Sequence, residues 1–194
     1  NQQSIPESLP SSLRVWLETA MKLPSWIERE PIDRATRFLS DHAISIAVIL
    51  STVSLLQLYS LKKGVKALHR TDQLGYSGAL KRLGSTMQFC AQTFTPQGLF
   101  EEGALIPVIL KVRLMHAVSR YYVQQTDWSE EELGVPICQE DLLATLMGFS
   151  RTPLRYLPKL GIKVTEQNAQ DVLYYWSVLG ELLGIRSDII PCNL

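Results

Sequence analysis

The stretch LIPVILKVRLMHAVSRYY at residues 105–122 decides the fold class, because its apolar residues recur at the spacing of a long helix. Helical spacing continues through most of the chain, and convincing strand-like alternation with a period of two is absent. Further helices are expected at residues 11–21, 79–93, 139–149 and 165–183. The sequence therefore predicts an all-α protein.

Two of these helical segments have recognisable ends. Ser129 and Glu132 have the spacing of a capping box, and Gly134 follows as a helix stop. Thr165 is placed to cap the last long helix, and Gly184 is placed to end it. These residues predict where the shorter and longer helices of the second half begin and end.

Length and composition limit the class of protein. A chain of 194 residues is one domain, or one domain with a short appendage. Its 46% apolar and 20% charged residues are ordinary for a globular protein. Nineteen basic residues balance nineteen acidic ones, so no net charge attracts nucleic acid, and no nucleic-acid partner is expected.

Residues 43–61, AISIAVILSTVSLLQLYSL, contain no charge over nineteen positions. That length is close to the roughly 20 residues that span a bilayer. Six of the residues are Ser, Thr or Gln, which favours a central helix buried on nearly all sides and leaves membrane association as the alternative. The chain begins at Asn1, so we expect it to be trimmed at its start, and its compartment and oligomeric state stay open.

His116 is the first candidate for chemistry. Arg113 precedes it by three residues and Arg120 follows it by four, so all three share a helix face. Two nearby cations should lower the pKa of the imidazole, which favours the neutral form that binds a metal, and they could pair with haem propionates. Haem is therefore the first cofactor to test. A hydrogen-bonded core histidine beside salt-bridged arginines is the alternative.

Arg82 and Thr86, in KRLGSTMQF, form a second candidate. They lie four residues apart, so a guanidinium and a hydroxyl share one helix face and could bind an anion or a polar diatomic ligand. Spacing alone favours a surface arginine and a threonine that bonds to its own helix. No Glu-x-x-His occurs, which leaves a carboxylate-bridged di-iron bundle without support.

Several segments, taken in order, resemble a family that comprises the latex-clearing rubber oxygenases and the ER-bound oxygenases of the mycophenolic acid pathway. The resemblance spans roughly residues 23–191. Its segments are LPSWIEREPIDRATRF, GVKALHRTDQL, KRLGSTMQF, KVRLMHAVSRYY, PICQEDLLATLMGFS and YYWSVLGELLGI.

This resemblance implies a helical fold with a globin-like core around a haem pocket. It implies that His116 is the proximal ligand of a haem b iron, and that Arg82 and Thr86 are catalytic residues on the distal side. Arg113 and Arg120 would orient the haem or support His116. The implied activity is that of an oxygenase, which cleaves a C=C bond of an apolar, isoprenoid-like substrate, such as a polyprenoid, with O2.

The chain also departs from the family pattern. Ser85 stands where those rubber oxygenases carry a lysine, and no carboxylate is assigned as a catalytic base. We expect residues 1–22 to be an N-terminal helical extension, and residues 23–194 to be an oxygenase-like domain that is truncated at Leu194. The alternative function is a non-enzymatic helical module of the same family, either haem-free or acting as a haem sensor or carrier.

Overall fold

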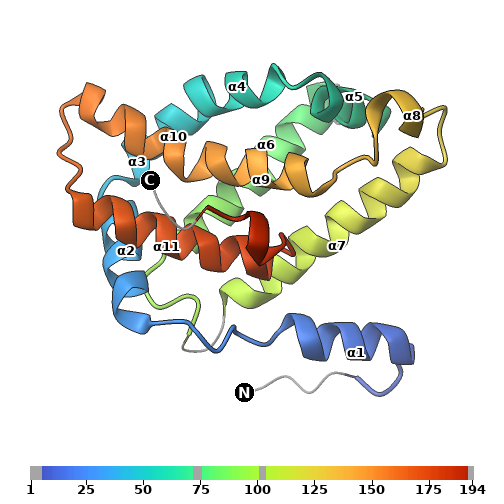
Figure 1. Ribbon diagram of the computed structural model, residues 1–194, viewed down its shortest axis with the longest axis horizontal. Coiled ribbons are helices and arrows are strands. Elements are labelled where there is room, and N and C mark those ends of the chain that lie inside the picture. The colour runs from blue at the N-terminus through green and yellow to red at the C-terminus, as the bar shows by residue number, and fades with distance from the viewer. Residues whose placement is uncertain (1–5, 72–75, 101–103, 192–194) are drawn as a thin grey trace.

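The computed structural model describes residues 6–71, 76–100 and 104–191. Within these ranges the chain forms helices and short connections without a strand, which confirms the all-α prediction (Figure 1). In chain order the elements are α1 (Ser11–Ala20), α2 (Arg29–Asp41), α3 (Ala43–Ile49), η1 (Leu50–Ser54), α4 (Leu55–Tyr59), α5 (Lys62–Arg70), α6 (Tyr76–Thr93), α7 (Leu105–Gln124), α8 (Glu130–Leu133), α9 (Gln139–Phe149), α10 (Arg151–Tyr156), η3 (Leu157–Leu160), α11 (Glu166–Leu182) and η4 (Ser187–Ile189).

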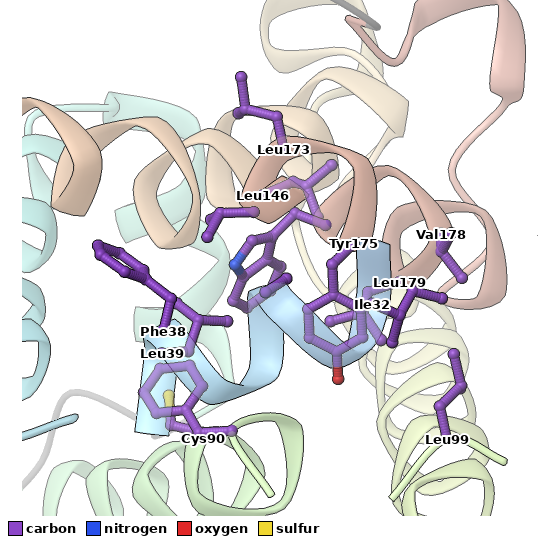
Figure 2. Close-up of a cluster of buried hydrophobic side chains, with 14 of the residues drawn as sticks. Ile32, Phe38, Leu39, Cys90, Leu99, Leu146, Leu173, Tyr175, Val178 and Leu179 are labelled. Atoms are coloured by element: carbon purple, nitrogen blue, oxygen red, sulfur yellow. The ribbon is translucent and has the colours of Figure 1, made fainter. Parts of the chain in front are cut away.

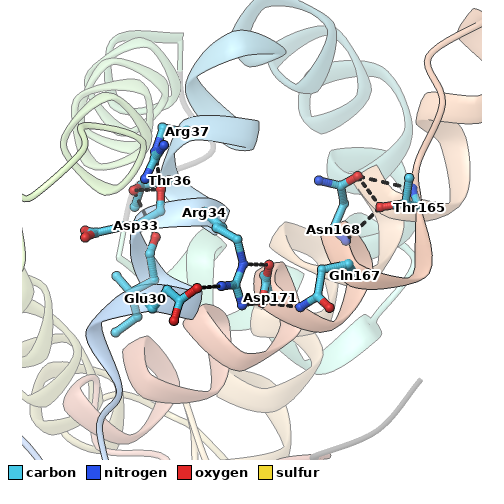
Figure 3. Close-up of polar contacts among 10 residues, drawn as sticks. Glu30, Asp33, Arg34, Thr36, Arg37, Thr165, Gln167, Asn168 and Asp171 are labelled. Carbon is cyan, nitrogen blue, oxygen red and sulfur yellow. Dashed lines mark hydrogen bonds and ion pairs between the residues drawn. The ribbon is translucent and has the colours of Figure 1, made fainter.

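The predicted helix ends are confirmed. The Ser129 hydroxyl accepts a hydrogen bond from the Glu132 amide at the start of α8, and Gly134 follows with a positive φ of 66°. The Thr165 hydroxyl accepts from the Asn168 amide at 3.1 Å and so caps α11 (Figure 3). Gly184 ends this region with a φ of 89°, which side chains other than glycine rarely adopt.

α11 is the central helix of the molecule. Ten of its seventeen residues are buried, and its most extensive helix contact is with α2. The buried carboxylate of Asp171 accepts from Nε and Nη2 of Arg34 at 2.7 and 2.9 Å (Figure 3). A buried carboxylate requires such a partner, so this two-pronged contact fixes the register of α2 on α11.

Residues 43–61 do not form the central buried helix that we expected. They form α3, the wider π-helical turn η1, and α4, and only one side of this segment is covered: Ile44 is 84% exposed and Leu56 68%. Ser54 holds the π-helical turn in place, because its buried hydroxyl donates to the Gly148 carbonyl of α9 at 2.7 Å. No single described helix has the length and hydropathy of a membrane span. One helix pair, α2 with residues 43–59, reaches these values when its two parts are taken together, and the pair is bent by 76°.

The core gathers around α11, with apolar side chains from α2, α6 and α9 packed against it (Figure 2). Trp176 is 1% exposed and stacks on the Phe149 ring at a centroid distance of 5.5 Å, and Phe89 lies on the same cluster. The Trp176 Nε1 is buried without a hydrogen-bond partner among the described residues. Trp176 therefore stabilises the fold by packing alone.

We expect the substitution Trp176→Ala to lower the free energy of unfolding by about 3–5 kcal/mol, because it leaves a large cavity in the core. Trp176→Phe should cost about 1–2 kcal/mol, since it retains an aromatic ring and also removes the unpaired N–H. Urea unfolding measures both values. Equal losses for the two variants would contradict a role in packing alone.

Candidate functional site

α6 places Arg82 and Thr86 together in a cavity of about 230 Å³ that we call the α4–α6 cavity. One wall is the segment from η1 to α4, the opposite wall is α6, and the end of α9 closes the space. The lining consists of Leu50, Ser51, Ser54, Leu55, Leu58, Tyr59, Ala79, Leu80, Arg82, Leu83, Thr86, Met87, Cys90, Gly148 and Phe149. Most of these side chains are apolar, so the cavity suits a largely hydrocarbon ligand.

The Thr86 hydroxyl is available within this cavity. Other helical threonines donate to a carbonyl of the preceding turn, as Thr36 does to Ile32 and Thr145 to Asp141. In the described part of the chain, no hydrogen bond of the Thr86 hydroxyl is found. The expectation from spacing alone, a helix-bonded threonine, is therefore wrong at this position.

Arg82 is half-buried, not a freely solvated surface residue as spacing alone suggested. Its guanidinium lies 5.2 Å from the centre of the Tyr59 ring, a cation–π contact across the cavity from α6 to α4. Burial lowers the pKa of Arg82, and no carboxylate within the described ranges pairs with it. This cation has an aromatic neighbour but no anion.

His116 lies on the inward side of α7, in line with the buried residues Ile109 and Val123 seven positions before and after it. Its Nδ1 is buried and has no hydrogen-bond partner in the described structure. Burial, and then the charge of Arg120, lower the pKa of the imidazole. The neutral form predicted from the sequence is therefore favoured, and a satisfied core histidine does not describe this side chain.

Arg113 and Arg120 are both engaged by backbone carbonyls at some distance along the chain. Arg113 donates to the Leu182 carbonyl of α11 at 3.3 Å and lies 5.5 Å from the ring centre of Trp16 in α1. Arg120 donates to the Ile137 carbonyl at 2.6 Å and also to the carbonyl of the preceding residue at 3.2 Å. The two arginines thus attach the His116 helix to the segments around it.

The structure brings Arg82 and Thr86 together, but His116 is not among the residues that line the α4–α6 cavity. Ser85 is exposed and also lies outside this lining. The described residues hold no group of three or more His, Cys, Asp or Glu arranged to bind a metal ion. A porphyrin needs only one side chain for its iron, so His116 fits that donor requirement by itself.

Sequence reasoning missed three contributors to the cavity. Tyr59 supplies the ring beside Arg82, Ser54 anchors the wall, and Gly148 leaves room for Leu58, whose Cδ1 lies 3.2 Å from where a Cβ on Gly148 would stand. The run of Ser and Thr within residues 43–61 was the available signal, because polar groups inside an apolar helix need partners.

Comparison with known proteins agrees with this fold. The chain is 25% identical over 196 residues to a rubber oxygenase from Streptomyces sp. (strain K30). This match covers 100% of this chain and 48% of that protein. The solved structure of a latex clearing protein in the closed state superposes with a TM-score of 0.82 at 24% identity, over 97% of this chain and 51% of that one. The chain thus spans about half the length of these relatives.

A family model matches most of the chain. Residues 36–193 match the catalytic domain described as ER-bound oxygenase mpaB/B′/rubber oxygenase. That range contains α3 to α11, and with them Arg82, Thr86 and His116. The chain belongs to the family of mpaB-type ER-bound oxygenases and rubber oxygenases.

Proposed function

We propose that this chain is the core of a haem b-dependent oxygenase that acts with O2 on an apolar, isoprenoid-like substrate and cleaves a C=C bond. Residues 23–194 would form the oxygenase domain, and residues 1–22 an extension. Membership of the family supports the oxygenase class. The observation that carries the cofactor assignment is the buried imidazole of His116, whose Nδ1 has no partner in the described structure.

His116 has the chemistry of an axial ligand. One ring nitrogen of a ligand histidine binds the metal, and the other usually donates a hydrogen bond that fixes the ring. The buried, unpaired nitrogen of His116 is available for such a role. When bound, haem b supplies the oxygen chemistry, and the protein supplies its ligand and surroundings.

Arg113 and Arg120 support His116 in this proposal. Their bonds to carbonyls of α11 and of the loop before α9 fix the height and rotation of α7. The charge of Arg120 also keeps the imidazole neutral, since a nearby cation disfavours protonation. Both effects serve a ligand that must stay unprotonated and hold one orientation.

The α4–α6 cavity provides the substrate side. Its apolar walls exclude water and accommodate a hydrocarbon chain, while Thr86 offers a hydroxyl and Arg82 a cation for polar groups on the substrate or for O2. Cys90 in the same lining stays a neutral thiol, because burial raises its pKa to about 12. The cavity therefore holds an apolar ligand without a competing nucleophile.

A haem-binding module without oxygenase activity is the second candidate. It is favoured by Ser85, an exposed serine at the position where the resemblance to the rubber oxygenases implies a lysine. Haem binding without turnover would identify such a sensor or carrier. O2-dependent cleavage of a polyprenoid would identify the oxygenase.

The cofactor assignment predicts a Soret band. Protein reconstituted with haem b should bind it close to one to one, measured by the pyridine haemochrome assay. His116→Ala should lose most of the bound haem or shift the band, whereas His69→Ala, a change at an exposed histidine of α5, should not. A wild-type protein without a Soret band, or a band untouched by His116→Ala, would overturn the assignment.

The lowered pKa of His116 predicts a pH dependence of stability. The unfolded imidazole takes up a proton near its ordinary pKa of about 6.5, and the folded one resists it, so stability should fall as the pH drops below about 6.5. His116→Gln should flatten this part of the profile, measured as urea midpoints between about pH 5 and 8. His69→Gln is the control, and a profile identical in wild type and His116→Gln would refute the explanation.

A further inference from the structure

We propose that the α4–α6 cavity binds an amphipathic ligand, a prenyl or acyl chain that ends in a carboxylate, with the carboxylate held by Arg82 and Thr86. The inference rests on the proposed function only in taking this ligand to be the substrate. Binding itself involves residues of α4, α6 and α9 and does not require haem.

Arg82 is, within the described structure, an unpaired cation in an otherwise uncharged cavity. Of the fifteen described residues that line the cavity, Arg82 alone carries a charge. Several arginines elsewhere have carboxylate partners: Arg34 binds Asp171, and Arg70 binds Asp127. A half-buried guanidinium that has lost part of its hydration without gaining an anion is costly, and a ligand carboxylate would compensate it.

The arrangement of Arg82, Tyr59 and Thr86 suits a carboxylate. A guanidinium binds a carboxylate through two parallel N–H groups, and its face stays free to stack on an aromatic ring. The Tyr59 ring, 5.2 Å from the Arg82 guanidinium, occupies such a face. Thr86 follows one helical turn later and offers a further donor to the same anion.

The hydroxyls of the two serines in the lining already donate hydrogen bonds to backbone carbonyls. Ser51 donates to the carbonyls of Ala47 and Val48, and Ser54 donates to the Gly148 carbonyl. These serines therefore satisfy the backbone of the cavity wall. Arg82, Thr86 and the Tyr59 hydroxyl are left to recognise a ligand, and Arg82 is the one cation among them.

The size of the cavity suits one segment of a chain. The volume of 230 Å³ is below the roughly 300–1,000 Å³ of sites that enclose a whole drug-sized ligand, so the cavity encloses one segment of a chain. Leu80, Leu83 and Met87 line it and are 53%, 45% and 43% exposed, so they extend the apolar surface outward. A hydrocarbon polymer has no group for Arg82. A hydrocarbon chain with one acidic end would bind both the apolar surface and the Arg82 cation.

Calorimetric titration of haem-free protein with farnesoic acid and with its neutral methyl ester tests the proposal. The acid should bind at least about tenfold more tightly than the ester, and added salt should reduce the difference. In the Arg82→Gln variant the acid should bind with only the affinity of the ester. Arg82→Lys should keep part of the preference, since it retains the charge without the paired N–H groups. Thr86→Val should weaken the acid a few-fold.

Lys81→Gln is the matched control, because Lys81 is an exposed cation next to Arg82 on α6 and lies outside the cavity lining. It should keep the full preference for the acid. Circular dichroism and urea midpoints establish that each variant is folded. Equal binding of acid and ester, a preference that survives Arg82→Gln, or a preference lost in Lys81→Gln would overturn the proposal.

Two further measurements separate this proposal from the proposed function. Farnesyl diphosphate, which carries more charge than one guanidinium can match, should bind no more tightly than the acid, and tighter binding would refute the carboxylate assignment. A Soret band that depends on His116, without any acid preference, would retain the oxygenase proposal and reject this ligand. A preference for the acid without haem binding would retain this ligand and reject the oxygenase proposal.

Discussion

The ion pair between the partly exposed Arg34 and the buried carboxylate of Asp171 is the constraint on which the rest of the structure depends. It fixes α2 on α11, the helix with the most extensive burial, and α11 then positions both helices of the site. The Tyr175 hydroxyl of α11 donates to the Thr93 carbonyl at the end of α6, and the Leu182 carbonyl accepts from Arg113 of α7. Each site helix is therefore attached to the core at a defined point.

The sequence predicted those features of the fold that arise from local interactions. Thr165 and Ser129 cap their helices through bonds that span three residues, and such bonds can be read from spacing. The widening of the helix within residues 43–61 could not be predicted, because the segment contains neither proline nor glycine to mark it. Its π-helical turn accompanies the bond from Ser54 to Gly148, ninety-four residues away, and that contact exists only in the folded chain.

The candidate site, like the fold, was predictable only where local spacing decides it. Helical spacing placed Arg113, His116 and Arg120 on one side of a helix, and Arg82 with Thr86 on another, as the structure has them. What each arginine contacts depends on distant segments. The carbonyl of Leu182 and the loop before α9 accept from α7, whereas the α6 arginine contacts the Tyr59 ring. Side chains that look alike in sequence therefore differ in their contacts: the α7 arginines donate to backbone carbonyls, and Arg82, which we propose to bind a ligand, contacts an aromatic ring.

The unsatisfied nitrogen of His116 supports a functional role for this residue independently of the sequence motif. Folded proteins pair nearly all buried polar groups, so exceptions require an explanation. The Trp176 Nε1 is an exception within the core and is offset by the packing of its ring. Arg14 Nε, Asp33 Oδ1 and His116 Nδ1 are the other buried side-chain atoms without a partner in the described structure, and of these only the His116 nitrogen lies on a helix of the candidate site. Departures from local consistency are expected where a chain binds something else, and His116 Nδ1 is such a departure on α7, the helix that we propose to hold the cofactor.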